Sequence, residues 1–284
     1  MLIGIQGLMP DDLNQLTDSH VKNIRDLGFF GVSCRFSNPF DVNKEQVKKI
    51  KSTLEFGGVK PCQVLASHPD IISKNDGQLG VEAMQKMCSV ANWIDTETLY
   101  LRPGSHNQSG SWYPHPENYS EKTFDVLVER VKIISKTAES EGVVLAVEGH
   151  VLSPLYSFQR VKDLIDSVGS KVLRFNSDPV NFISGTKDAF DSKKLINEMF
   201  SLLGEYTVSG HTKDFNIQDQ LVLNITECEI GSGLLDHGTY LTMFEKYCSN
   251  SYMMIEHVQK HRIPGSLSSL IGFGDLVNIN LRRI

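Results

Sequence analysis

The sequence predicts one α/β domain of eight strands and eight helices, a (β/α)8 barrel. Eight short apolar runs alternate with stretches in which apolar residues recur at helical spacing. Strict alternation of this kind indicates right-handed βαβ units and a parallel sheet. The chain has 284 residues, close to the usual size of about 250 for one such barrel. No phosphate-binding glycine motif of an open doubly wound sheet is present, so we expect the closed form.

The expected strands are apolar, and most contain several β-branched or aromatic residues. Residues 143–147 are the clearest case, because five apolar residues in succession are typical of a strand buried on both faces. The eight predicted strands are residues 2–7, 29–36, 59–66, 98–102, 143–150, 172–176, 206–210 and 252–255.

The helices between them are indicated by periodicity and by end signals. Residues 9–12 (Met-Pro-Asp-Asp) read as a helix start, and Gly28, Gly57 and Gly169 read as helix ends. The expected helical stretches are residues 9–27, 41–56, 81–91, 120–138, 158–168, 188–203 and 239–247, followed by a helical tail.

The pattern is interrupted twice within what we expect to be a single domain over residues 1–284. The stretch 103–120 is a long loop with several aromatic residues, and long loops in compact domains are usually functional or disordered. In residues 215–236 the alternation is poor and a glycine-rich turn follows, which predicts a hairpin-like insertion.

Composition narrows the class of protein. The net charge of -6 and the pI of about 5.8 argue against a general nucleic-acid or anionic-membrane surface. Five cysteines without a C-x-x-C pair suit a reducing compartment better than a disulfide framework. The N-terminal residues do not resemble a signal peptide, and no run of about 18 apolar residues occurs. We therefore expect a cytoplasmic protein with no membrane or nucleic-acid partner; homo-oligomerisation stays open.

Polar residues that can bind metal stand at the ends of four successive predicted strands. Glu148 follows residues 143–147 directly, and an unpaired carboxylate is costly to bury. Asp178, His211 and Glu256 end the next three strands. In a parallel barrel these ends meet on one face, where the chemistry of such barrels is found.

Each residue also has a plain structural explanation. A single carboxylate at a strand end is more often a helix cap or a salt-bridge partner, and a single histidine more often makes a structural hydrogen bond. Four such residues at the ends of four successive strands are hard to explain in that way. Three carboxylates and one imidazole suit Mn²⁺, Mg²⁺, Co²⁺ or Zn²⁺, so the sequence predicts one divalent metal ion held by Glu148, Asp178, His211 and Glu256.

The pattern resembles the xylose isomerase-like barrel superfamily, in its sugar phosphate isomerase/epimerase branch. The segments Asp178-Pro-Val-Asn181 and His211-Thr-Lys213-Asp resemble the D-x-x-H/N and H-x-K-D segments of that branch. The resemblance covers essentially the whole chain and implies one divalent ion held by Glu, Asp, His and Glu of strands five to eight. Asn181 stands where many epimerases of the branch have a substrate-binding histidine.

Five further residues are candidates for substrate contact. Lys213 lies two residues beyond His211 and would share its inward face, to hold a substrate oxygen or, alternatively, to pair with Asp214. His150 bears the same relation to Glu148. Asn181 is a candidate through the resemblance. The loop after residue 101 adds two more candidates, Arg102 and Trp112, the latter as a stacking surface for a sugar.

These residues together predict a metal-dependent isomerase or epimerase of a small sugar or related hydroxy-carbonyl compound. Proton transfer would pass through a metal-bound enediolate, with Glu148 and Glu256 as the catalytic carboxylates on opposite faces. A dehydratase of inosose type is the nearest alternative. An endonuclease IV-like nuclease would need more histidines, and a non-catalytic sugar-binding barrel would keep the fold without turnover.

Overall fold

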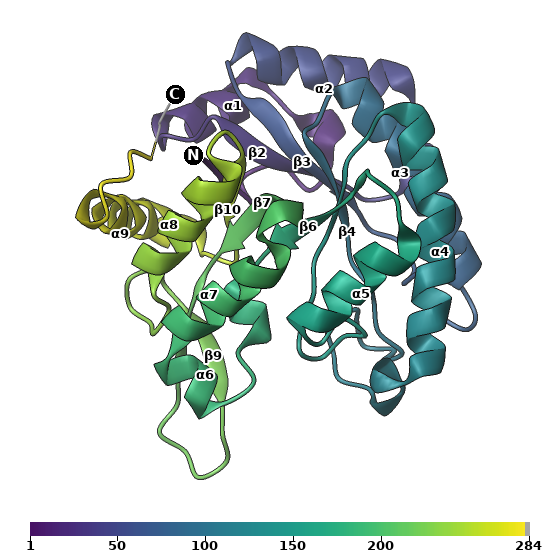
Figure 1. Cartoon of the computed structure of the whole chain (residues 1–284). Coiled ribbons are helices and arrows are strands. Elements are labelled where there is room, and N and C mark those ends of the chain that lie inside the picture. Colours follow the sequence, from purple (N-terminus) through teal and green to yellow (C-terminus); the bar gives the residue numbers. More distant parts are fainter. Residues whose placement is uncertain (282–284) are drawn as a thin grey trace.

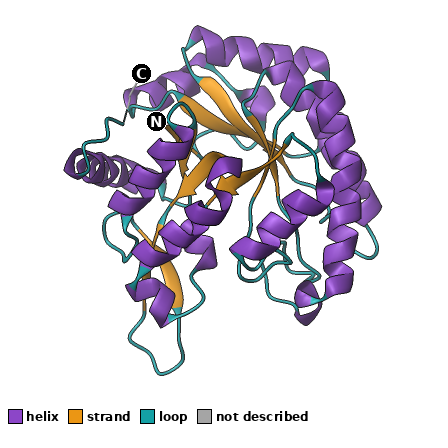
Figure 2. Ribbon diagram, in the orientation of Figure 1, coloured by secondary structure: helices purple, strands orange, loops and turns teal. Residues whose placement is uncertain are grey.

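The computed structural model describes residues 1–281 and contains a closed barrel of parallel strands inside a layer of helices (Figures 1 and 2). Around the barrel the strand order is β1-β10-β7-β6-β5-β4-β3-β2. Every neighbouring pair is parallel. The predicted (β/α)8 fold is therefore confirmed. The barrel strands are β1 (Leu2–Ile5), β2 (Gly31–Phe36), β3 (Lys60–Ala66), β4 (Thr98–Leu101), β5 (Leu145–Val147), β6 (Leu173–Ser177), β7 (Thr207–Thr212) and β10 (Tyr252–Ile255).

The helices cover the outside of the barrel (Figure 2). Several begin at a side-chain cap: Ser120 accepts a hydrogen bond from the amide of Thr123, and Ser157 from that of Arg160. Gly142 ends a helix at φ 67°, where a residue with a Cβ would be strained. The helices are α1 (Asp18–Asp26), α2 (Lys44–Phe56), α3 (Gly77–Ile94), α4 (Glu121–Glu141), α5 (Phe158–Val168), α6 (Thr186–Phe190), α7 (Ser192–Leu203), α8 (His237–Cys248) and α9 (Ile263–Leu276).

The predicted helix start at residues 9–12 is wrong. Asp12 accepts a hydrogen bond from the amide of Asn14 and caps only a short 3₁₀ turn. The chain then becomes extended at Leu16, and α1 begins after Thr17. Thr17 and His20 cap each other there, since the Thr17 amide donates to the His20 ring. A local side-chain turn thus ends the first helical segment before it can propagate.

The predicted helix over residues 188–203 is two helices. The break lies at Asp191, whose backbone leaves the helical region (φ −130°, ψ 50°). The carboxylate of Asp191 accepts a hydrogen bond from the amide of Lys194 and so starts α7. An aspartate inside a helical pattern can act as a cap instead of continuing the helix.

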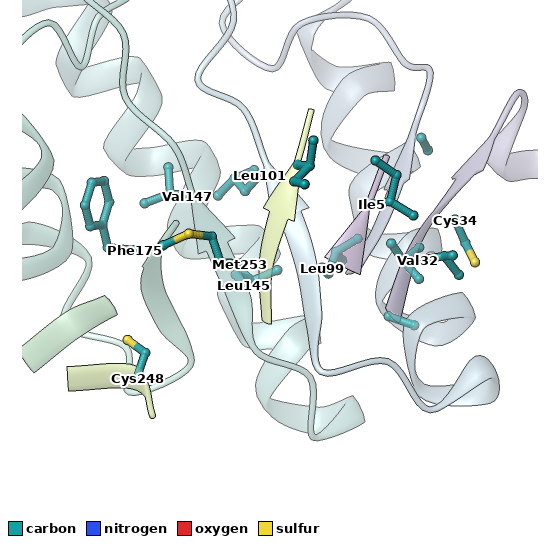
Figure 3. Packing of buried hydrophobic residues seen from close by; sticks show 14 of the residues in the cluster. Ile5, Val32, Cys34, Leu99, Leu101, Leu145, Val147, Phe175, Cys248 and Met253 are labelled. Atoms are coloured by element: carbon teal, nitrogen blue, oxygen red, sulfur yellow. The ribbon is translucent and has the colours of Figure 1, made fainter. Parts of the chain in front are cut away.

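The core lies inside the barrel and between its strands and the helices (Figure 3). Alternate residues of one strand point to these two regions, so a central strand is apolar at every position. Leu145, Ala146 and Val147 of β5 are all fully buried. Burying one such aliphatic side chain contributes about 1.5–3 kcal/mol. The core ends at the carboxyl ends of the strands, where polar residues replace apolar ones.

The insertion forms an antiparallel hairpin of β8 (Asp214–Ile217) and β9 (Ile225–Cys228). It follows β7 almost directly and extends away from the barrel on the side where α6 lies (Figure 1). Three successive residues of its connection, Leu221 to Leu223, are exposed. Among residues 1–281, no helix combines the length and apolarity that crossing a membrane requires.

Candidate metal centre

The four strand-end residues meet at the carboxyl ends of adjacent strands. Glu148 follows β5, Asp178 follows β6, His211 belongs to β7 and Glu256 follows β10, and these strands are neighbours in the barrel in that order. The exposure of the four residues is low, from 0% at Asp178 to 5% at Glu256. These side chains form a cluster of buried charges, which must compensate one another.

His211 is the centre of this cluster. Its Nδ1 atom lies 2.9 Å from Oε1 of Glu148 and 3.0 Å from Oε2 of Glu256. Its Nε2 atom lies 3.0 Å from the amide oxygen of Gln63 and 3.1 Å from the amide nitrogen of Gln6. Because Nε2 can donate its proton to Gln63, Nδ1 is the nitrogen that is free to act as a ligand.

Glu148 is held by two neighbours that the sequence analysis missed. The Tyr100 hydroxyl donates a 2.6 Å hydrogen bond to Oε2 of Glu148, and the Asn176 amide donates a 2.8 Å bond to Oε1. Ser209 in turn donates to Asn176 at 2.6 Å and fixes its amide orientation. All three lie inside strands β4, β6 and β7. A polar residue within an otherwise apolar strand was the signal that could have found them.

Lys213 is buried and pairs within the cluster. Its ammonium lies 2.8 Å from Oε1 of Glu256 and 2.9 Å from Oδ2 of Asp178. The alternative pairing with Asp214 does not occur, because the carboxylate of Asp214 accepts hydrogen bonds from the amides of Phe215, Gly231, Gly233 and Leu235 instead. Lys213 therefore belongs to the site, whereas Asp214 holds the hairpin.

The residues present fit a divalent cation. Glu148, Asp178 and His211 each offer one ligand atom, and these atoms lie within 4.8 Å of one another. Oδ2 of Asp178 and Nδ1 of His211 are buried, and neither has an aligned hydrogen-bond partner despite the short ion-pair distances. Within residues 1–281, Lys213 and His211 are the cationic groups within ion-pair distance of the three buried carboxylates. A divalent ion beside a neutral His211 would balance these charges, and the mixed oxygen and nitrogen donors suit Mn²⁺, Mg²⁺, Co²⁺ or Zn²⁺.

The pKa values follow from burial and from this charge imbalance. Burial raises the pKa of Asp178 to about 7, although the charge of Lys213 acts in the opposite direction. Burial would also raise the pKa of Glu148 and Glu256, but the positive charge of His211 offsets it and holds both pKa values below normal. For His211 burial lowers the pKa, yet the two glutamates raise it well above its usual value. Without a bound cation, therefore, a proton on His211 takes up part of the excess negative charge.

Three of the predicted substrate contacts lie in loops that contact one another. The rings of Trp112 and His150 lie 5.6 Å apart. Burial and the charge of Lys213 lower the pKa of His150 to about 4, which keeps its imidazole neutral. Asn181 is buried, and its backbone oxygen accepts a hydrogen bond from the amide of Val151, in the loop after His150. The loops after β4, β5 and β6 thus contact one another.

Arg102 does not join the cluster. Its guanidinium donates to the carboxylate of Asp70 and to the backbone oxygens of Ala66 and His68. Asp70 also accepts hydrogen bonds from Ser105 and Ser111. Arg102 and Asp70 therefore hold the long loop after β4 against the loop after β3. A polar cavity of about 660 Å³ between these two loops contains none of the four strand-end residues.

Fold and site together define a (β/α)8 barrel with an acidic, histidine-containing centre at the carboxyl ends of its strands. The family model described as xylose isomerase-like TIM barrel matches residues 21–268. The chain therefore belongs to the xylose isomerase-like TIM barrel family. A sequence search among curated proteins found no match.

Solved structures with the same fold include three of different description. A xylose isomerase-like TIM barrel protein from Mycobacterium smegmatis in complex with magnesium has a TM-score of 0.75 and 12% identity, covering 97% of this chain and 96% of that one. D-psicose 3-epimerase from Clostridium cellulolyticum H10, with D-tagatose, has a TM-score of 0.72 and 13% identity, covering 99% and 100%. The probable 3-DHS dehydratase of petrobactin synthesis from Bacillus anthracis has a TM-score of 0.71 and 14% identity, covering 95% and 97%. At such identities the likeness is one of fold.

Proposed function

We propose that this protein is a divalent-metal-dependent isomerase or epimerase of a small sugar or related hydroxy-carbonyl compound. The observation that carries the proposal is that carboxylates of two different strand ends, Glu148 and Glu256, both lie close to His211 Nδ1, at 2.9 and 3.0 Å. Two carboxylates that flank one centre can serve two faces of a bound carbon atom. Structures of similar fold include proteins described as 3-epimerases of D-psicose and L-ribulose.

The protein's own residues would move the proton. Glu148 would remove the proton next to the substrate carbonyl, and Glu256, after taking a proton from water, would deliver it to the opposite face, which inverts the centre. Lys213, held between Asp178 and Glu256, donates to a substrate oxygen and opposes the negative charge that develops there. Glu148, Asp178, His211 and Glu256 would hold the ion, which when bound supplies Lewis-acid polarisation of the carbonyl.

The nearest rival is a dehydratase, favoured by one observation. Lys213 contacts both Asp178 and Glu256, so it could assist the departure of a hydroxyl group. One structure of similar fold is described as a probable dehydratase. A nuclease of endonuclease IV type is disfavoured because the described residues contain one His/Asp/Glu cluster of ligand geometry, with a single histidine. A non-catalytic sugar-binding barrel would contain the same site but would not convert the sugar.

A proton-exchange screen distinguishes these candidate functions. The protein, loaded with Mn²⁺, is incubated in D₂O with a panel of ketoses and followed by NMR. An isomerase or epimerase incorporates deuterium next to the carbonyl, and a dehydratase also forms a product that has lost water. Absence of both from the whole panel would contradict the proposal and favour a binding barrel.

The variant Glu148→Gln tests the assignment of the base. Its amide keeps the size of the side chain and can accept a hydrogen bond, but it cannot remove a proton. We expect substrate affinity within a few-fold of normal and a loss of turnover of about 10²–10⁴-fold, the usual contribution of general base catalysis. Glu141→Gln, at the far end of α4, is the control. Normal exchange in Glu148→Gln would show that another group is the base.

A further inference from the structure

A carboxylate of the hairpin reaches the centre from outside the barrel. Glu227 belongs to β9, and its Oε1 atom lies 3.8 Å from the ammonium of Lys213. The Glu227 side chain is 46% exposed, whereas that of Lys213 is 6% exposed. Glu227 therefore lies at the boundary between the buried charges and solvent.

The residue after Glu256 holds this carboxylate in place. Nδ1 of His257 lies 2.9 and 3.0 Å from the two oxygens of Glu227. His257 has a φ of 56°, in the left-handed region that residues other than glycine adopt infrequently. Backbone conformations of this kind cluster at functional sites, where the surroundings hold them. Thirty residues separate His257 from Glu227 in the sequence, and no local pattern connects them.

The charges around Glu227 disfavour an anionic substrate. Lys213 is committed to Asp178 and Glu256. Arg102, after β4, is committed to Asp70 and backbone oxygens. Within residues 1–281, no lysine or arginine other than Lys213 lies within ion-pair distance of Glu227 or of the three buried carboxylates. With a divalent ion bound beside Lys213 the three buried carboxylates are balanced, so the negative charge that a phosphate group would meet is that of Glu227.

We infer that Glu227 is a specificity-determining residue that accepts a hydrogen bond from a hydroxyl group of an uncharged polyhydroxy ketone and excludes its phosphate esters. The inference rests on the proposed function and names its substrate class. His257 acts as a positioning residue for Glu227. The hairpin is then the element that selects the substrate, while the barrel performs the proton transfer.

Two pairs of probes test this selectivity: D-fructose with its 6-phosphate, and D-tagatose with its 6-phosphate. For the protein loaded with Mn²⁺, we expect proton exchange with a neutral ketose at a kcat/KM at least about 100-fold above that of its ester, given the usual value of interactions with charged groups. Saturation-transfer NMR with the metal-free protein should show binding of the neutral ketoses and no binding of their phosphate esters. This second readout does not depend on turnover.

Three variants locate the selectivity in Glu227. Glu227→Gln should raise KM for the neutral ketose about tenfold with little change in kcat, since a charged acceptor is lost. Glu227→Lys should raise the relative kcat/KM of the phosphate ester at least about tenfold, because a repulsive charge becomes attractive. Glu229→Gln is the matched control, because Glu229 lies just beyond β9 and pairs with Arg262 instead of the site. It should behave as the parent protein does.

The possible results separate the role of Glu227 from the proposed function. Equal exchange with a ketose and its ester, or Glu227 variants indistinguishable from Glu229→Gln, would overturn the role of Glu227 and leave the proposed function standing. An ester bound in preference to its neutral partner would also overturn it. No exchange with any ketose would overturn the proposed function and, with it, this inference.

Discussion

The buried charge of Glu148 depends on single residues contributed by three other strands. Tyr100 and Asn176 donate hydrogen bonds to its two oxygens, and His211 brings a positive charge or a shared cation. Each of these three residues comes from a different strand, β4, β6 or β7, so no local segment could satisfy this carboxylate. Hydrogen bonds to ionised groups contribute about 1.5–3 kcal/mol each, which indicates the size of the effect expected when one is removed.

Tyr100→Phe removes the hydroxyl and little else. We expect the fold to persist and the affinity for Mn²⁺ to fall about 10–100-fold, which is typical when a partner of a metal ligand is lost. Titration calorimetry with Mn²⁺ measures this change. Tyr113→Phe, on an exposed side chain of the loop after β4, is the control. Equal affinities for the two variants would mean that the hydroxyl does not orient Glu148 for a metal ion.

The pKa of His68, which follows β3, predicts that the stability of the fold depends on pH independently of the metal centre. Burial, together with the charge of Arg102, lowers the pKa of His68 from 6.5 to about 4. The unfolded chain therefore binds this proton more readily, and the contribution of His68 to the free energy of unfolding falls as the pH decreases from about 6.5 to about 4.

The comparison uses His68→Asn, since its amide can still donate to the oxygen of Pro69, which His68 contacts at 2.8 Å. We expect the urea midpoint of this variant to fall less than that of the parent between pH 7.5 and pH 5. His261→Asn, at an exposed histidine, should follow the parent. A parallel decline in all three proteins would contradict the expectation.

At the scale of elements, the hairpin depends on one aspartate. Asp214 accepts hydrogen bonds from the amides of Gly231, Gly233 and Leu235 and so ties the returning chain to the start of β8. His237 lies 3.2 Å from the same carboxylate and is buried. The hairpin that carries Glu227 is thereby anchored at its base, although its far end is exposed.

Asp214→Asn should loosen this anchor. The amide group cannot accept as many hydrogen bonds, and a loss of about 1–3 kcal/mol in the free energy of unfolding is expected from buried donors left without partners. Hydrogen exchange should accelerate at the amides of residues 225–235 in particular. Asp219→Asn, in the connection between β8 and β9, should leave both quantities unchanged. Uniform acceleration throughout the barrel would argue against a local anchor.

At the scale of the whole molecule, closure of the barrel concentrates negative charge at one end. Three carboxylates converge with a single lysine and a single histidine, and their mutual repulsion opposes folding. A cation that binds only the folded chain would relieve it and stabilise the protein by mass action.

We therefore expect the thermal midpoint to fall after treatment with EDTA and to rise again with Mn²⁺ in a concentration-dependent manner. At a free ion concentration of 100 times the Kd, the stabilisation is about 2.7 kcal/mol. Asp178→Asn should abolish the response because a ligand atom without another partner is lost, whereas exposed Asp125→Asn should keep it. An identical rise in both variants would show that the ion binds elsewhere.

The sequence by itself determined which segments form strands and helices, because periodicity and end signals are local properties. It also determined which residues stand at the strand ends, and so placed Glu148, Asp178, His211 and Glu256 on one face once a parallel barrel was assumed. It was wrong where a local side-chain turn competed with a helix, at Asp12 and at Asp191.

Only the tertiary structure decided how those residues are supported. The contacts of Tyr100 and Asn176 with Glu148 depend on the register of neighbouring strands, which no single strand encodes. The pairing of Lys213 with Asp178 and Glu256 instead of Asp214 depends on where the hairpin leaves the barrel. Glu227 reaches the site because an antiparallel turn brings it back, and His257 meets it across thirty residues. These contacts join segments distant in sequence, so they exist only once the barrel has closed.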